Sequence, residues 1–419
     1  MNIESLLENN KVCSCGKQHM VDIKYVVIEK GAIKKLNSLT NEYKHILLVS
    51  DVNTYKACGK DAESVIMDKI ETSKVFECEG YLVPDEQRVE ELKACITSKT
   101  DLIIGVGSGV INDLCKYVSF NTGLPYYIIA TAPSMDGYAS NGAAMIFQNM
   151  KVSFNTRVPK AIIADTDVIK NAPSEMIKAG YGDIIGKYSA LNDWKLGHVV
   201  MDEYFCDEVY NLTYETVKNT VSLAAGLLER NEQSIQALME ALVIVGIAMS
   251  YVGNSRPASG SEHHLSHYFE VVGLLNNEPY FLHGIDVAYS TVVTQQLREK
   301  LLEIQKPTKF HEFDHSIWEE NIRKVYGKAA DGIIALQDKI GWYTKDFQDV
   351  YTRKWEDIKD VLREVPSSGK IKKLLEDVEL PYEDFLKEYH EEKIQNALLY
   401  AKDLKDRYTV LWPYYTILG

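Results

Sequence analysis

Short apolar runs alternate with helical patterns from the N-terminus to about residue 170, and this alternation constrains the fold more than any other feature. Strand-like runs cover residues 45–50, 102–106, 126–130 and 161–164, and each is followed by a polar residue or a glycine. A helical pattern fills residues 113–120. Short apolar strands that alternate with helices are typical of a parallel sheet buried on both faces. The sequence therefore predicts an N-terminal α/β domain.

The pattern changes near residues 167–175, where helical periodicity replaces the strand signals. Before that point, residues 143–148 and 151–156 predict a hairpin with Asn149 and Met150 in its turn. We therefore predict two domains, an α/β domain over residues 1–170 and an all-helical domain over 171–419. The predicted elements of the second domain include a buried helix at 233–252, a loop at 305–316 and a long amphipathic helix at 388–411 that Pro413 ends.

Charge and composition exclude several classes of function. The chain carries 46 basic and 60 acidic residues, a net charge of −14, so we expect no nucleic-acid partner. The longest apolar stretch, residues 241–249, is far shorter than the ~20 residues of a membrane span. Residues 1–11 contain no apolar segment typical of a signal peptide. With seven cysteines and no export signal, we expect a reduced, cytoplasmic protein that does not bind membranes.

A glycine-rich turn follows the strand-like run at 102–106. Residues 105–109 read Gly-Val-Gly-Ser-Gly, and a helical pattern begins with Val110, Ile111, Asn112 and Asp113. Glycines let a backbone approach a phosphate closely, and a helix N-terminus offers N–H groups and a positive dipole end. The spacing differs from the G-x-G-x-x-G fingerprint of a first-strand dinucleotide site. The motif therefore predicts either phosphate binding or a tight turn with positive φ.

A second polar loop, residues 131–140, leaves the end of the strand-like run at 126–130. It contains Thr131, Ser134, Asp136 and Ser140. Small hydroxyl side chains suit contacts to dinucleotide phosphates or to a nicotinamide amide, and the Asp136 carboxylate is placed to face the same site. The alternative interpretation is an ordinary polar loop with a hydroxyl-stabilised turn.

Four of the ten histidines fall between residues 263 and 283, which suggests a metal or catalytic site. They are His263, His264, His267 and His283. His263 and His267 are four residues apart and share a face if the segment is helical. Asp183, in the stretch Gly-Tyr-Gly-Asp, is either a helix cap or a third ligand. Imidazole and carboxylate ligands suit Zn, Ni or Fe.

The N-terminal segment Cys13-Ser14-Cys15-Gly16-Lys17-Gln18-His19 brings three soft ligands close together in sequence. Such a set suits zinc, but no fourth ligand is evident from the sequence. The alternative is a flexible, reduced N-terminal arm.

From about residue 20 to its end, the chain resembles the sn-glycerol-1-phosphate dehydrogenase family, within the superfamily of glycerol dehydrogenases, iron-containing alcohol dehydrogenases and dehydroquinate synthases. The resemblance rests on an ordered set of motifs. These are G-x-x-x-D (109–113), T-x-P-S-x-D-G-x-x-S (131–140), G-x-G-D (180–183), S-R-P-A-S-G-S-E-H-x-x-S-H (255–267) and H-G (283–284).

The resemblance implies a dehydroquinate synthase-like fold, in which a Rossmann-like nucleotide-binding domain precedes an all-α metal-binding domain. It implies NAD(H) or NADP(H), one divalent metal (Zn, Ni or Fe), and a homodimer or larger homo-oligomer. The implied cofactor residues are Gly107, Gly109, Val110, Ile111, Asn112, Asp113, Thr131, Ser134 and Ser140. The implied metal ligands are Asp183, His263 and His283; Asp136, Asp183 and His267 contact substrate, and Asp183 and His267 are the catalytic candidates.

Two departures from related families favour the glycerol and glycerol-phosphate branch. Lys187 stands where iron-containing alcohol dehydrogenases often place a ligand histidine, and Asp183 stands where dehydroquinate synthases use glutamate. The implied reaction is NAD(P)H-dependent reduction of dihydroxyacetone phosphate to sn-glycerol 1-phosphate, in the direction of phospholipid biosynthesis. Alternatives are a glycerol or polyol dehydrogenase, or a dehydroquinate synthase-like lyase.

Three further residues complete the sequence-based hypotheses. Arg256 and Lys187 are candidates to bind the substrate phosphate, because they lie near the proposed ligands in sequence. Asp51 follows the first clear strand, where a carboxylate accepts a hydrogen bond from a ribose hydroxyl and weakly favours NAD over NADP.

Overall fold

The computed structural model describes residues 2–9, 11–78, 80, 82–147 and 150–419. The chain forms two compact units. The first contains Met1–Ile184 and Lys218–Ser255, and the second contains Ile185–Val217 and Arg256–Gly419. The predicted domain boundary at residue 170 stays a prediction.

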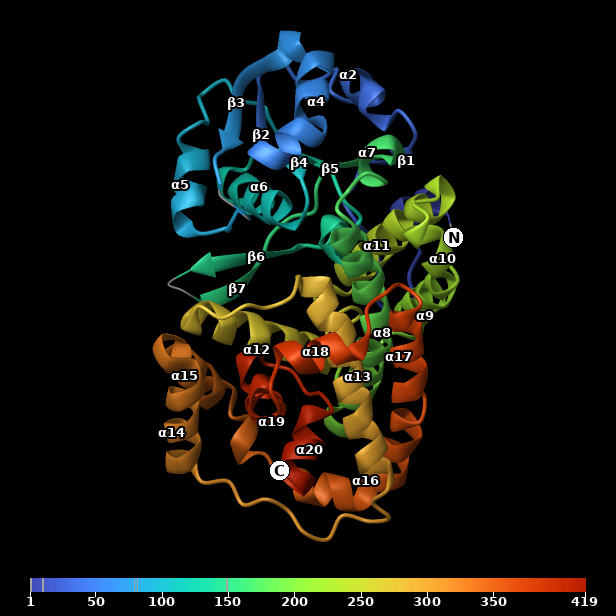
Figure 1. The fold of residues 1–419 in the computed structure, drawn as a ribbon, viewed down its shortest axis with the longest axis vertical. Helices are drawn as coiled ribbons and strands as arrows, with labels where there is room; N and C mark the ends of the chain where they lie inside the picture. The colour runs from blue at the N-terminus through green and yellow to red at the C-terminus, as the bar shows by residue number, and fades with distance from the viewer. Residues whose placement is uncertain (1, 10, 79, 81, 148–149) are drawn as a thin grey trace. The chain divides into compact units, whose positions relative to one another are not determined.

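A six-stranded parallel sheet forms the centre of the first unit (Figure 1). Four predicted strands are confirmed as β2 (Ile46–Asp51), β4 (Leu102–Gly107), β5 (Tyr126–Ala130) and β8 (Ala161–Asp165). Their side chains are almost entirely buried, as expected for strands covered on both faces. The order is β1-β8-β5-β4-β2-β3, so these four strands form the middle of the sheet.

The two edge strands were not predicted. They are β1 (Tyr25–Glu29) and β3 (Ile70–Phe76), and most of their residues are only half-buried. In β3 the charged and hydroxyl residues Glu71, Thr72, Ser73 and Lys74 interrupt the apolar pattern. A search for continuous apolar runs finds central strands and misses edge strands of this kind.

The predicted hairpin is confirmed as the antiparallel pair β6 (Gly142–Phe147) and β7 (Met150–Asn155). Met150 begins β7 instead of lying in the turn, and Asn149 lies outside the described residues.

Several helices of the first unit carry the chain from one strand of the sheet to the next (Figure 1). The predicted helix at 233–252 is confirmed as α11 (Glu232–Val252), which Asn231 caps. Among the described residues, α11 alone is long and apolar enough to cross a membrane, but most of its apolar window is buried, as in a core helix. The other helices are α1 (Ile3–Leu7), α2 (Leu36–Leu39), α3 (Val52–Thr54), α4 (Lys60–Val65), α5 (Glu86–Lys93), α6 (Gly109–Thr122), α7 (Thr166–Ile169) and α10 (Ala224–Leu228).

Every strand described in the structure precedes residue 170, and the second unit is helical, as predicted. Two long helices, α8 (Ser174–Met201) and α9 (Asp207–Val221), each run unbroken from one unit into the other. The remaining helices are α12 (Ser261–Asn276), α13 (His283–Leu302), α14 (His315–Tyr326), α15 (Ala330–Ile340), α16 (Phe347–Leu362), α17 (Ser368–Glu376), α18 (Tyr382–Glu388), α19 (Glu391–Tyr400) and α20 (Leu411–Leu418). The segment between α13 and α14 is the predicted loop.

The predicted helix at 388–411 is wrong. The chain forms α19, a short 3-10 turn over Ala401–Leu404 and then α20. Lys402 and Asp403 pair at 3.2 Å within this turn, and both are fully buried. Pro413 lies inside α20, in its first turn, where backbone N–H groups have no intrahelical acceptor. The helical spacing of apolar residues continues through residues 388–411 in the sequence, although the chain changes direction within this segment. This continuity is the reason for the wrong prediction.

Candidate active site

A cavity of about 840 Å³ opens at the carboxyl ends of the parallel strands in the first unit. Its lining includes residues that end four strands or follow them within two positions, namely Asp51, Ser108, Thr131, Ala132 and Asp165. This edge of an open parallel sheet is where α/β proteins bind ligands, and the volume is typical of a cofactor site. Of the predicted cofactor residues, Asp51 and Thr131 line this cavity.

The glycine-rich turn joins β4 to α6, and its glycines serve close packing. None of Gly105, Gly107 and Gly109 has a positive φ, so the prediction of a positive-φ turn is wrong. A Cβ on Gly107 would lie 2.6 Å from the Cβ of buried Ile111, which packs under the turn. Ser108 precedes the first turn of α6 and lines the cavity, so the α6 N-terminus lies at the cavity wall. This is the arrangement that binds phosphate.

Asn112 and Asp113 bind other parts of the first unit. The Asn112 side chain accepts a hydrogen bond from Tyr126 Oη at 3.1 Å and donates to Asp113 Oδ1 at 3.0 Å. Asp113 Oδ2 accepts from the Ala144 amide of β6 at 3.0 Å. Burial raises the pKa of Asp113 above its ordinary value. These contacts connect α6 to the loop and hairpin that follow β5.

The second polar loop is held against α8. The loop is buried, and Ser134, Asp136 and Ser140 are each 9% exposed or less. Gly180, in the first turns of α8, contacts the loop so closely that a Cβ would collide with the Pro133 carbonyl oxygen. The glycine of the G-x-G-D motif is therefore required by packing. One turn later, Asp183 Oδ2 accepts the Asp136 amide at 3.0 Å, which orients the Asp183 carboxylate.

Lys116 supports the same loop from α6. It is 1% exposed, and its Nζ donates to the carbonyl oxygens of Gly137 at 2.7 Å and Gly142 at 2.9 Å. Burial lowers the pKa of Lys116 to about 8, while Asp113 and Asp136 oppose that shift. Sequence analysis did not identify Lys116, and its position three residues after Asp113 on a helix is the only signal for it.

We expect Lys116 to make stability depend on pH. Below pH 8 the lysine is charged in both the folded and the unfolded state, so the folded state carries the full free-energy cost of burying the charge. Between pH 8 and 10.5 the folded state binds fewer protons than the unfolded state, so the stability contribution of Lys116 rises with pH. Denaturant unfolding at pH 7.5 and 9.5 should show wild type gaining roughly 2 kcal/mol relative to Lys116→Met. Exposed Lys99→Met is the control, and an equal pH response of both variants would contradict the assignment.

Asp183, His263 and His283 form a group that can hold a metal ion. One ligand atom from each lies within 4.8 Å of the others. Asp183 is fully buried on α8, His263 is 6% exposed on α12, and His283 is the first residue of α13. A carboxylate and two imidazoles are ligands that Zn, Ni and Fe accept, so the donor set fits one divalent metal.

Buried Glu262 orients His263. Its Oε1 lies 2.7 Å from His263 Nδ1. A carboxylate accepts from Nδ1–H and leaves the Nε2 lone pair available to a metal, an arrangement common around metal-binding histidines. Sequence analysis missed Glu262, although it directly precedes His263. His264 points elsewhere: it is fully buried, and burial followed by the charges of Lys405 and Arg407 lowers its pKa well below the ordinary value.

Small residues bring α8, α12 and α13 together. A Cβ on Gly186 of α8 would lie 2.5 Å from Val287 Cγ1 of α13. Ser189, three residues further along α8, lies 3.2 Å from Ser261 Oγ of α12 and 3.1 Å from Thr294 Oγ1 of α13. The helices that carry the three candidate ligands are thus packed closely beside the ligand positions.

Arg298 and Asp193 form a fully buried ion pair next to this contact. Arg298 Nη2 donates to Asp193 Oδ1 at 2.8 Å, and Arg298 Nε donates to Asn192 Oδ1 at 2.8 Å. Asp193 Oδ2 accepts the Ser261 amide at 2.6 Å and so binds the first residue of α12. The pair fixes the start of the helix that carries His263.

The other predicted substrate residues lie in varied environments. His267 is partly exposed, with its ring centroid 5.6 Å from that of His283. Lys187 is fully buried one turn after Asp183 on α8. Arg256 is 2% exposed and forms a two-point ion pair with Glu203, with Nε 2.6 Å from Oε1. A substrate phosphate would therefore have to compete with the Glu203 carboxylate for the Arg256 guanidinium group.

Comparison with known proteins decides the family. A family model described as iron-containing alcohol dehydrogenase matches residues 27–173. Over 292 residues the chain is 36% identical to a glycerol-1-phosphate dehydrogenase [NAD(P)+] of Halalkalibacterium halodurans, which covers 68% of this chain and 73% of that protein. The chain belongs to the glycerol-1-phosphate dehydrogenase family. A family member of Pyrococcus horikoshii is 31% identical over 298 residues, 68% of this chain and 84% of its own length.

Solved structures of related dehydrogenases share the fold of this family member. An iron-containing alcohol dehydrogenase of Thermococcus thioreducens aligns with a TM-score of 0.60 at 13% identity, over 94% of this chain and 99% of that one. A probable glycerol dehydrogenase of Sinorhizobium meliloti aligns with a TM-score of 0.53 at 18% identity, over 88% of this chain and 98% of that one. The predicted architecture, an α/β domain followed by a helical one, is confirmed.

Proposed function

We propose that this chain catalyses the reversible, NAD(P)H-dependent reduction of dihydroxyacetone phosphate to sn-glycerol 1-phosphate. The observation that carries the proposal is the Asp183–His263–His283 group in a member of the glycerol-1-phosphate dehydrogenase family. The alternatives, a polyol dehydrogenase and a dehydroquinate synthase-like lyase, are not favoured by the relatives.

The cavity of the first unit is the proposed site of the nicotinamide dinucleotide. Its pyrophosphate would lie at Ser108 and the N-terminus of α6, where N–H groups point outward. Thr131 and Asp51 line the same cavity, and the other proposed cofactor residues position the two loops or form their backbone. Asp51 Oδ1 already accepts the amides of Asn53 and Thr54, so its carboxylate is held in place to accept a hydrogen bond from a ribose hydroxyl.

Asp183, His263 and His283 are the proposed ligands of one divalent metal. When bound there, the cation supplies a Lewis acid that stabilises the negative charge that develops on a carbonyl oxygen. The Asp136 amide and the Glu262 carboxylate hold two of the ligands in orientation. With Lys187 instead of a fourth ligand histidine, three protein ligands leave positions open, as catalytic metal sites do.

The proposed chemistry at the substrate divides between orientation and proton transfer. Hydride passes from the nicotinamide to C2 of the ketone, and the resulting alkoxide takes a proton for which His267 is the proposed donor. Asp136 and Asp183 are the proposed contacts to the substrate hydroxyls. For the phosphate we propose Lys187 and Arg256, although the Arg256 guanidinium is also paired with Glu203.

The first experiment follows oxidation of NADH and NADPH by the metal-reconstituted protein, with dihydroxyacetone phosphate and dihydroxyacetone assayed in parallel. We expect turnover of the phosphorylated ketone and sn-glycerol 1-phosphate as its product. Turnover confined to dihydroxyacetone would identify a polyol dehydrogenase, and absence of net cofactor oxidation with either ketone would contradict both assignments.

We further propose that the enzyme works in the cytoplasm as a homodimer or larger homo-oligomer. All seven cysteines are described without a disulfide, which suits a reducing compartment. Size-exclusion chromatography with light scattering measures the oligomeric state directly.

A further inference from the structure

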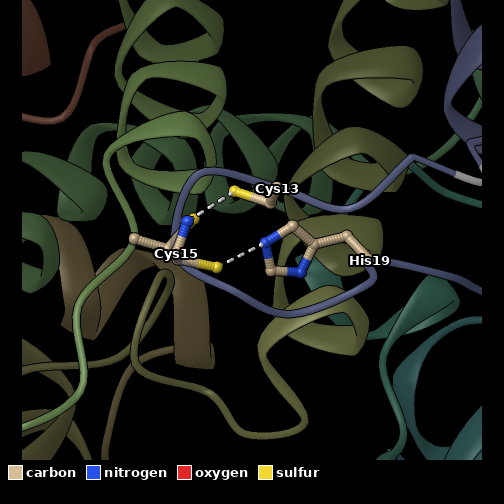
Figure 2. Close-up of side chains that lie close together, drawn as sticks. Cys13, Cys15 and His19 are labelled. Carbon is tan, nitrogen blue, oxygen red and sulfur yellow. Dashed lines mark hydrogen bonds between the residues drawn. The ribbon is translucent and has the colours of Figure 1, made fainter.

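The N-terminal loop that the family resemblance left unexplained is a small, ordered hairpin. Val12 pairs with Gln18 as an antiparallel bridge, and the Cys13 amide donates to the Lys17 carbonyl at 2.9 Å. Gly16 turns the chain with a φ of +82°, a value that favours glycine. The turn brings the side chains of Cys13, Cys15 and His19 together (Figure 2).

His19 is held in the orientation of a metal ligand. It is 2% exposed, and its Nδ1 lies 3.0 Å from the carbonyl oxygen of Tyr251, whose ring stacks on the imidazole. A carbonyl oxygen only accepts hydrogen bonds, so Nδ1 carries the proton and Nε2 keeps its lone pair. That Nε2 faces Cys15 Sγ at 3.4 Å (Figure 2). A second partner that fixes the tautomer is typical of metal-binding histidines.

Two sulfur atoms complete the group of ligands on the hairpin. The Cys15 amide donates to Cys13 Sγ at 3.5 Å. One ligand atom from each of Cys13, Cys15 and His19 lies within 4.8 Å of the others. All three residues belong to the first compact unit.

The dimensions of this group match a tetrahedral zinc ion. Zn–S bonds of about 2.3 Å and Zn–N bonds of about 2.05 Å at tetrahedral angles place sulfur and nitrogen ligands about 3.6 Å apart. The Cys15–His19 separation of 3.4 Å is close to that value. No disulfide joins the cysteines. The hairpin is also too short to bury a hydrophobic core of its own, and small domains of this kind often gain stability from a bound metal.

We propose that Cys13, Cys15 and His19 bind a structural zinc ion. The sulfur ligands separate this ion from the catalytic metal, whose proposed ligands are a carboxylate and two imidazoles. The ion orders the N-terminal hairpin. The inference does not depend on the proposed function, because the two ligand groups share no residue.

Sulfur ligation tests the proposal, because the Asp183–His263–His283 group contains no sulfur. We expect elemental analysis of the purified full-length protein to show one zinc per chain beyond the catalytic metal. X-ray absorption of this zinc should report at least two sulfur ligands and one nitrogen ligand, and exchange with cobalt should produce a thiolate-to-metal charge-transfer band. Zinc without sulfur ligands, or cobalt without that band, would overturn the proposal, and neither measurement requires a variant to fold.

Variants then test the individual ligands. Cys13→Ser and Cys15→Ser should each lose this zinc and weaken or abolish the cobalt charge-transfer band. Cys95→Ser is the matched control, since Cys95 is partly exposed like Cys15 but lies outside the group. Cys15→Ser protein that retains one zinc with an unchanged number of sulfur ligands would overturn the ligand assignment.

Discussion

Replacing His263 by alanine should remove the catalytic metal and lower kcat/KM by about 10³-fold or more. The variant leaves Asp183 and His283 as the remaining ligands of the group. Lewis-acid stabilisation of a developing alkoxide is worth several kcal/mol, and a change of about 1.4 kcal/mol in the barrier is tenfold in rate. Metal content per chain and steady-state rates with NADH and dihydroxyacetone phosphate measure both effects, and we expect the loss of one metal ion.

Two companion variants make this result specific. Glu262→Gln keeps all three ligands but removes the carboxylate that orients His263, so we expect a smaller loss, about 10- to 100-fold. His315→Gln removes a histidine that is half-exposed and lies outside the group, and it should leave metal content and rate unchanged. Full metal content and activity in His263→Ala would refute the proposed ligand set.

Replacing Arg298 by leucine should destabilise the protein by about 3–5 kcal/mol, the usual cost of leaving one member of a buried ion pair without its partner. Arg298 and Asp193 are both 0% exposed, and Asp193 also binds the Ser261 and Val410 amides. Without Arg298, the buried Asp193 carboxylate would lose its charge partner. We therefore expect the start of α12, which Asp193 binds, to change position, and the free energy of unfolding to fall. Denaturant unfolding followed by circular dichroism measures the effect.

The control for this variant is an arginine in an exposed pair. Arg353 and Asp349 are four residues apart on α16 and are 60% and 57% exposed. Solvent screens such a pair, so Arg353→Ala should leave the stability of the protein nearly unchanged. If Arg298→Leu were no more destabilising than Arg353→Ala, the buried pair would not fix the start of α12.

Sequence alone determined the class of the fold and the candidate chemistry. The central strands are continuous apolar runs because both faces of a parallel sheet are buried, so β2, β4, β5 and β8 were predictable. Edge strand β3 was not, because half-exposed positions accept polar residues. The histidine cluster was visible because His263 and His283 lie close together along the chain.

Only the tertiary structure decided which residues support the site. The supporting residues are ordinary charged residues in the sequence, and burial beside specific partners gives them their roles. They are Lys116, Glu262, Asp193 and Arg298. The path of the chain after α19 was equally hidden, because no helix-breaking residue marks the turn and its partners, Gln337 and Tyr343, which both bind Asp403, lie far away along the chain.

The N-terminal zinc group shows the same division. The sequence supplied Cys13, Cys15 and His19 in one short segment, since a hairpin of this size carries ligands that are local in the chain. The partner that orients His19, the carbonyl oxygen of Tyr251, lies far from it along the chain, and no spacing rule connects the two. Local geometry follows from local sequence, whereas a partner from a distant part of the chain is placed only by the packing of the first unit.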